Sequence, residues 1–177
     1  LGGLFDQVGY GFHRYSTDQQ WTLPHFEKML YDQAMHVLAY TEAYQATGED
    51  RYETTAREVI AYVLRDLQAP AGGFYSAEDA DSENEEGEME EGAFYVWSTD
   101  AVRDLLDADL AELVIDVYNL SPEGNYQEES TGKRTGKNVL HLDRSLAEEA
   151  DRREMDEDVL RERLGTARAA LLEARSD

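Results

Sequence analysis

Two helical segments joined by a very short turn limit the fold of this chain most strongly. In residues 24–47 apolar side chains occupy nearly every face of a helix, which is typical of a helix buried on several sides. In residues 50–68 they recur on one face only, opposite charged groups. Gly48 stands where a glycine commonly ends a helix. We therefore predict an αα-hairpin of one inner and one outer helix, the repeating unit of an α/α toroid.

The remainder of the chain predicts shorter elements. Glycine-flanked aromatic segments at 74–76 and 93–97 indicate the two strands of a small β-hairpin, with the acidic run 77–91 as its loop. Residues 121–138 are polar and rich in glycine, which favours a loop. The fold class that follows is mostly α, with an αα-hairpin of the toroid kind and a small β-hairpin insertion, and the family resemblance described below implies a partial (α/α)6 toroid. The further helices are expected at 99–107, 109–118, 144–151 and 156–175.

The net charge of the chain excludes some classes of binding partner. Asp and Glu total 39 against 16 Lys and Arg, a net charge of −23. These acids are spread along the chain, which indicates a solvated acidic surface, and with only three lysines the composition suggests a halophilic source. Such a surface repels phosphate groups, so we expect neither nucleic acid nor an anionic membrane as partner. No apolar run approaches the ~18 residues of a membrane span, and we expect a cytoplasmic location.

Several chemistries are missing from the sequence. The chain has no cysteine, which excludes disulfides, thiolate nucleophiles and cysteine-based metal sites within it. It also has no phosphate-binding glycine loop, no Gly-x-Ser-x-Gly motif and no His-Glu-x-x-His motif. Asp79, Asp81, Glu83 and Glu90 follow an EF-hand-like spacing, but Asn84 takes the place of the required glycine. We therefore predict no metal and no cofactor.

Candidate proton-transfer groups gather between Gly9 and Asp32, in a loop that we expect to enter a helix near Pro24. Two histidines and a carboxylate there, His13, His25 and Glu27, have the chemistry of a general acid and base. A helix N-terminus would keep His25 neutral. The structural alternative makes His13 a satisfied loop histidine and His25 a capping residue of the first turn.

A second acidic group and several aromatic residues extend this candidate site. Glu78 and Asp79, with Asp81, follow a Gly-Phe-Tyr segment and could provide the carboxylates of glycoside chemistry, or form a solvated acidic loop. Aromatic faces stack on sugars, although aromatic residues are more often part of a core. Arg14 and Lys28 could orient an anionic group or pair with Glu27 or Asp32. The aromatic candidates are Tyr15, Trp21 and Tyr75, followed by Tyr95 and Trp97.

Several long sequence motifs in the chain resemble those of a known protein family. They are GGLFDQ at 2–7, GFHRYSTD at 11–18, PHFEKMLYDQA at 24–34, GGFYSAEDADSE at 72–83 and EGAFYVW at 91–97. They resemble the toroid region of the spermatogenesis-associated thioredoxin-like family, in which a thioredoxin-like domain precedes an (α/α)6 toroid. That toroid is similar to six-hairpin glycosidases and N-acylglucosamine 2-epimerases. The resemblance implies that residues 1–177 are a fragment of one toroid domain, with the thioredoxin-like domain upstream and the rest of the ring downstream.

This resemblance implies a carbohydrate-active pocket of the epimerase or glycoside hydrolase kind. A small-molecule carbohydrate is then the expected partner, and a partial ring is expected to self-associate. The alternative is a non-catalytic scaffold that works with the upstream redox domain, so the residues leave open whether the chain is an enzyme. The expected catalytic residues are His13, His25, Glu27, Glu78 and Asp79, and the expected substrate-binding residues are Arg14, Tyr15, Trp21 and Tyr75.

Overall fold

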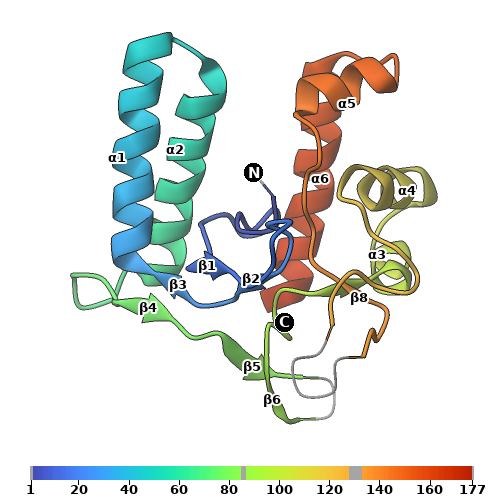
Figure 1. Cartoon of the computed structure of the whole chain (residues 1–177), viewed down its shortest axis with the longest axis horizontal. Helices are drawn as coiled ribbons and strands as arrows, with labels where there is room; N and C mark the ends of the chain where they lie inside the picture. Colours follow the sequence, from blue (N-terminus) through green and yellow to red (C-terminus); the bar gives the residue numbers. More distant parts are fainter. Residues whose placement is uncertain (1, 85–86, 128–132, 177) are drawn as a thin grey trace.

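The helices form two groups with the N-terminal segment lying between them (Figure 1). This arrangement is seen in a computed structural model that describes residues 2–84, 87–127 and 133–176. The first group is the pair α1 (Leu30–Thr47) and α2 (Asp50–Tyr62), continued by a π-helical turn at Val63–Leu67. The predicted mostly helical fold is confirmed. The second group contains α3 (Thr99–Leu105), α4 (Ala108–Val117), α5 (Leu146–Arg152) and α6 (Glu157–Ser176).

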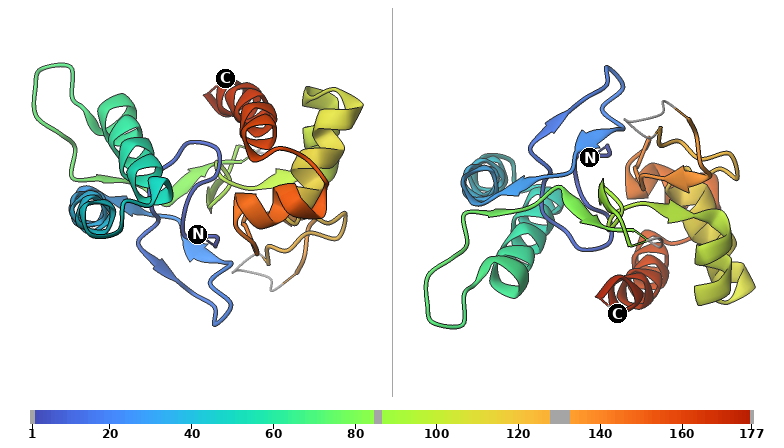
Figure 2. Two further views of the ribbon diagram at one scale, coloured as in Figure 1. Left: turned by 90° about the horizontal axis from the view of Figure 1, so that it is seen from above. Right: turned by 90° about the horizontal axis from the view of Figure 1, so that it is seen from below.

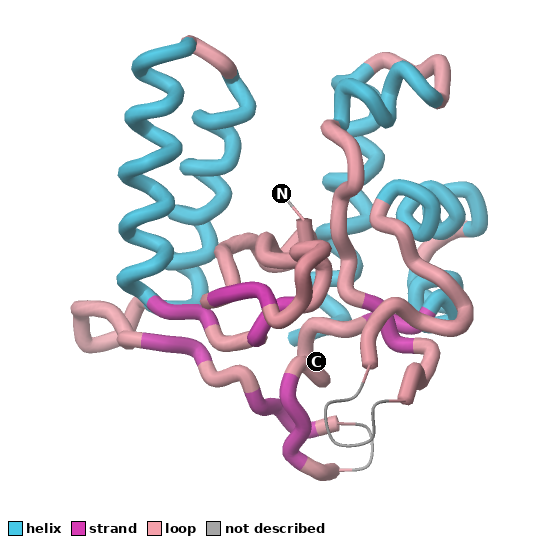
Figure 3. Tube along the Cα trace, in the orientation of Figure 1, coloured by secondary structure: helices cyan, strands magenta, loops and turns pink. Residues whose placement is uncertain are grey.

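Short antiparallel strand pairs run along the base of the two helical groups (Figure 3). Two of these pairs connect segments that are distant in the sequence and thereby join the N-terminal segment, the acidic segment and the loop before α5. The pairs are β1 (Tyr15–Ser16) with β2 (Pro24–His25), β3 (Lys28–Met29) with β4 (Ala77–Glu78), β5 (Asp81–Glu83) with β6 (Met89–Glu91), and β7 (Trp97–Ser98) with β8 (Lys137–Asn138).

The predicted start of the first helix near Pro24 is wrong, because α1 begins at Leu30. The six preceding positions hold two short strands instead, in which His25 lies opposite Tyr15 and Lys28 lies opposite Glu78. Long-range backbone pairing therefore replaces the intrahelical bonds that the local sequence favours. His25 and Glu27 consequently lie before the helix and not in its first turn, where they were predicted.

The β-hairpin also differs from the prediction. Its strands are β5 and β6, inside the run 77–91 that we expected to be a loop, and Ser82 pairs with Glu90. Asn84 closes the turn, since its side-chain oxygen accepts from the backbone N–H of Glu88. Phe74 makes only an isolated bridge to Gln68, and Trp97 pairs with Asn138. Residues 85–86 of the predicted loop, and 128–132 of the predicted loop 121–138, lie outside the described residues.

The αα-hairpin is confirmed, but α1 is less buried than its composition predicts. Gln33 is its one buried residue, whereas Tyr31, Met35 and Leu38 are more than half exposed. The helix lies at the edge of the molecule, and α2 and the N-terminal loop cover one side of it (Figure 2). The exposed three recur at i, i+4 and i+7 and form one apolar stripe, which we call the α1 stripe.

The later helices agree with their predicted positions to within two residues. Ser98 caps α3 as predicted, and Ser145 forms a capping box with Glu148 at the start of α5. The largest core cluster joins α3, α4 and α6 through residues such as Val102, Val114 and Leu160, all fully buried. In the described part of the chain, no helix has the length and apolar character needed to cross a membrane.

Candidate functional site

A histidine between two carboxylates forms the first polar cluster of the N-terminal segment. His25 Nδ1 lies 2.7 Å from Glu91 Oε1, and His25 Nε2 lies 3.6 Å from Glu27 Oε2. Arg14 donates to Glu27 over 2.7 Å, and the ring of Tyr15 stacks on the imidazole at 4.9 Å between centroids. We call these five residues the hairpin cluster, because the β1–β2 hairpin brings most of them together.

The hairpin cluster is partly open to solvent. The side chains of His25, Glu27 and Glu91 are each about a quarter exposed. Glu91 is held in place by a second bond, from the backbone N–H of Phe26 to its Oε1 over 3.1 Å. The longer separation of His25 Nε2 from Glu27 leaves that ring nitrogen able to bond a ligand hydroxyl. This arrangement has the parts of a general acid–base centre.

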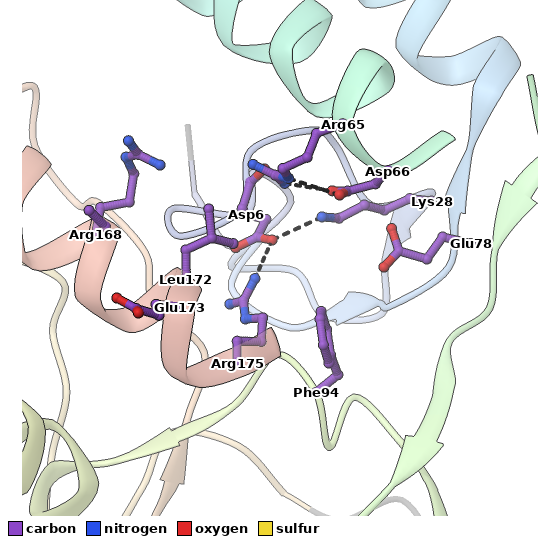
Figure 4. A pocket seen from close by; sticks show the side chains of 12 residues that line it. Asp6, Lys28, Arg65, Asp66, Glu78, Phe94, Arg168, Leu172, Glu173 and Arg175 are labelled. Carbon is purple, nitrogen blue, oxygen red and sulfur yellow. Dashed lines mark hydrogen bonds and ion pairs between the residues drawn. The ribbon is translucent and has the colours of Figure 1, made fainter. Parts of the chain in front are cut away.

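A second cluster of charged groups is buried inside the protein. The carboxylate oxygen Asp6 Oδ2 accepts from Lys28 Nζ over 2.9 Å and from Arg175 Nη1 over 2.7 Å, as Figure 4 shows. The three side chains are between 2% and 4% exposed. Lys28 Nζ also donates to the carbonyl of Tyr10 and lies 4.4 Å from the centroid of the Tyr62 ring. We call Asp6, Lys28 and Arg175 the buried triad.

The electrostatics of the triad favour its charged form. Burial alone would raise the pKa of Asp6, but the charges of Arg175 and Lys28 hold that pKa well below its usual range. Asp6 Oδ1 in addition accepts from the backbone N–H of Val8. The triad therefore joins the N-terminal loop, β3 and α6 through one ionised carboxylate.

His13 lies inside the protein, away from solvent. Its Nδ1 is 2.9 Å from the carbonyl oxygen of Phe26, and its ring meets the ring of Tyr95 edge-on at 4.7 Å. Burial, assisted by the charge of Lys28, lowers the pKa of His13 to about 3. The residue is thus neutral and makes the contacts of a satisfied loop histidine.

The other predicted site residues are dispersed. Glu78 accepts from the hydroxyl of Tyr62 over 2.5 Å and lies near the buried triad, while Asp79 is exposed and caps the N–H of Asp81. Trp21 lies in the β1–β2 turn and is 61% exposed. Tyr75 is more than half exposed, on the segment that leads to β4. The structure therefore brings four predicted residues together, namely Arg14, Tyr15, His25 and Glu27.

Sequence reasoning missed the partners that come from distant segments. Glu91 is 66 residues from His25, and Arg175 is 169 residues from Asp6. Glu91 is the first residue of the motif EGAFYVW at 91–97. Membership of that motif is the one signal in the sequence that could have distinguished it from the other acidic residues, of which the chain has 39 in total. Among the residues described here, no group of three His, Asp or Glu side chains is placed to hold a metal ion.

These observations define the class of protein as a mostly helical chain in which short strand pairs carry a histidine–carboxylate cluster. No protein-family model matches the chain. It is 42% identical to human spermatogenesis-associated protein 20 and 43% identical to the mouse protein, in each case over 98% of the chain. An uncharacterized protein of Caenorhabditis elegans is 37% identical over 78% of the chain. These similarities support the assignment of the chain to the spermatogenesis-associated protein 20 family. The chain spans about a quarter of the length of the mammalian relatives, 24%.

Proposed function

We propose that this chain contributes to a carbohydrate-active pocket and that the hairpin cluster is its acid–base centre. The observation that carries the proposal is the position of His25, between Glu27 and Glu91 and beneath the exposed ring of Tyr15. Sugar-processing sites need a proton-transfer group, a paired carboxylate and an aromatic face. These three parts meet here, with the imidazole nitrogens 2.7 and 3.6 Å from the two carboxylates and the ring of Tyr15 stacked on the imidazole.

We also propose an (α/α)6 toroid as the setting of this pocket. The α1–α2 hairpin is the unit of such a ring, and the family motifs resemble those of a toroid similar to six-hairpin glycosidases and N-acylglucosamine 2-epimerases. Fold analogy of this kind does not by itself assign a reaction.

Each member of the hairpin cluster has a distinct role in this proposal. His25 Nε2 takes or returns the substrate proton, while Glu91 holds the other ring nitrogen and fixes the ring orientation. Glu27 is the paired carboxylate, and Arg14 either holds it in place or binds an acidic group of the sugar. Tyr15 provides the stacking face. Glu78 and Asp79 lie outside the cluster, so we assign the first proton transfer to His25.

Substitution of the hairpin cluster is expected to remove turnover. His25→Gln and Glu27→Gln should each lower kcat by about 10²- to 10⁴-fold, the usual contribution of a general acid or base. Tyr15→Ala should chiefly raise KM, because it removes binding area. The test is product analysis at high salt on monosaccharides, disaccharides, N-acetylated sugars and sugar phosphates, with the 177-residue chain.

Glu53→Gln is a matched control for Glu27→Gln, because it also breaks an arginine–carboxylate pair, in that case with Arg57 on α2. It should leave turnover unchanged. Sugar binding without turnover, unaffected by His25→Gln, would instead favour the non-catalytic scaffold. No response to any sugar would refute the carbohydrate proposal.

The α1 stripe leads to a separate prediction about assembly. We expect the isolated chain to self-associate through this exposed apolar surface, once high salt has screened its net charge of −23. Met35→Ser together with Leu38→Ser should then shift the sedimentation coefficient to that of a monomer. Val159→Ser, which removes an exposed apolar side chain from α6, is the control and should leave the association unchanged. Equal self-association of the unmodified chain, the double variant and Val159→Ser would contradict this prediction.

A further inference from the structure

The turn of the β1–β2 hairpin holds a tryptophan outside the core. Trp21 lies in this turn, between the two strands, and is 61% exposed. In both views of Figure 2 the hairpin, drawn in blue, projects from the rest of the molecule. The other tryptophan of the chain, Trp97, is 9% exposed. An indole has one of the largest apolar surfaces of any side chain, so at Trp21 a large gain from burial is not realised.

The backbone of Trp21 is also in a conformation that a bulky residue rarely adopts. Its φ is 62°, in the left-handed region that favours glycine and tolerates asparagine. Four described residues other than glycine have a positive φ, and Trp21 is the one among them whose large apolar side chain is exposed. Neither core packing nor local preference therefore accounts for a tryptophan at this position. Strained residues of this kind are concentrated at functional sites.

Hydrogen bonds fix the turn in this conformation. The carbonyl oxygen of Trp21 accepts from the backbone N–H of Gly3 over 2.8 Å. The N–H of Thr22 donates to Asp18 Oδ1 over 2.9 Å. Glycine is required at position 3, because a Cβ atom there would collide with the carbonyl oxygen of Thr22. The indole is therefore presented to solvent from a fixed backbone.

The same hairpin carries the stacking face of the hairpin cluster. Tyr15 is 51% exposed, and its ring stacks on His25. Trp21 precedes His25 by four residues, so their Cα atoms are at most about 14 Å apart, the reach of an extended chain of that length. A chain of two or three sugar rings is long enough to extend from Tyr15 to Trp21. The two aromatic side chains therefore offer stacking faces to successive rings of one oligosaccharide.

The residues around Trp21 favour an uncharged ligand. Gln19 and Gln20, which precede it, are both exposed. Their amides can donate and accept hydrogen bonds, as sugar hydroxyl groups require. The turn 17–23 contains no basic residue, so it offers no charge to bind a phosphate or a carboxylate.

We propose that Trp21 forms a second sugar-stacking subsite, and that the substrate of the hairpin cluster is an uncharged oligosaccharide of at least two rings. This inference rests on the proposed function, because it takes Tyr15 as the first stacking face. It adds the length and the charge of the substrate, which the hairpin cluster alone does not define.

The test is calorimetric titration of the 177-residue chain at high salt with sugars of different length. Glucose is compared with cellobiose and maltose, and N-acetylglucosamine with N,N′-diacetylchitobiose. We expect at least one disaccharide to bind about tenfold more tightly than its monosaccharide, because a second ring is stacked. Tryptophan emission should shift to the blue with that disaccharide alone, since the exposed indole of Trp21 is then covered.

Trp21→Asn should remove the advantage of the disaccharide and leave the affinity for the monosaccharide unchanged. Asparagine tolerates the left-handed backbone, so the variant should be at least as stable as the unmodified chain in urea. Phe74→Ala is the matched control, because it removes another half-exposed aromatic ring, outside the hairpin, and it should bind as the unmodified chain does.

Two results would overturn the subsite, namely equal affinity for monosaccharides and disaccharides, or a disaccharide advantage that persists in Trp21→Asn. In either case the proposed function would stand, because sugars would still be bound. Failure of every sugar to bind would overturn both proposals.

Discussion

Asp6→Ala is expected to lower the free energy of unfolding by about 3–5 kcal/mol, the usual result when one partner of a buried ion pair is removed. The substitution would leave Lys28 and Arg175, at 2% and 3% exposure, without the carboxylate that both contact. Val8 would also lose the acceptor of its backbone N–H. Urea denaturation at pH 7 and constant salt measures this loss.

Asp66→Ala is the control for this prediction. Asp66 also pairs with an arginine, Arg65, but both side chains are about a third exposed. Ion pairs of that exposure contribute at most about 1 kcal/mol. A loss of similar size in both variants would show that the buried triad does not stabilise the junction of the N-terminal loop, β3 and α6.

Acidification is expected to destabilise the protein through His13. In the unfolded chain this imidazole takes up a proton with a pKa near 6.5, whereas in the folded protein burial lowers the pKa to about 3. The unfolded state therefore binds more protons between these values, and stability falls as pH falls from about 7 towards 3. The slope approaches ~1.4 kcal/mol per pH unit, which amounts to about 3 kcal/mol between pH 7.5 and pH 4.5.

His13→Gln isolates this contribution, because glutamine does not titrate and can still donate to the carbonyl of Phe26. We expect the variant to be less stable at pH 7.5 but to lose about 3 kcal/mol less than the unmodified chain on going to pH 4.5. Asp6 does not obscure this comparison, since its lowered pKa affects stability only below the usual aspartate range, near pH 4. If the free energies of unfolding of the two proteins changed equally with pH, the conclusion that His13 is buried and neutral would be wrong.

The helices were predictable from the sequence because their signals are local. The change from an all-round apolar pattern to a one-sided pattern predicted α1 and α2, and Ser98 predicted the start of α3. Prediction failed at Pro24–Met29, where β3 pairs with the distant strand β4, and at 74–97, where the acidic run forms the local β5–β6 hairpin and Trp97 pairs with the distant Asn138. Propensity describes a segment alone and cannot include a partner strand that lies some fifty residues away.

The residues of the candidate site also fall into two groups, those that were predictable from the local sequence and those that come from distant segments. Arg14, Tyr15, His25 and Glu27 are close in the sequence, and a short hairpin was enough to bring them together. The partners Glu91 and Arg175 come from β6 and α6, and the chain gives no local signal that joins them to His25 or Asp6. Glu91 and Arg175, which complete the two clusters, could therefore be identified only from the folded structure.

We propose that His25 moves a proton on a carbohydrate, and ¹H NMR of the sugar panel in D₂O would detect that transfer. Hydrolysis would appear as new anomeric signals, and epimerisation through proton removal next to a carbonyl would appear as loss of the exchanged C–H signal. We predict one of these changes with the unmodified protein and neither with His25→Gln. Spectra that stay constant for every sugar, or that change equally with His25→Gln, would contradict the claim.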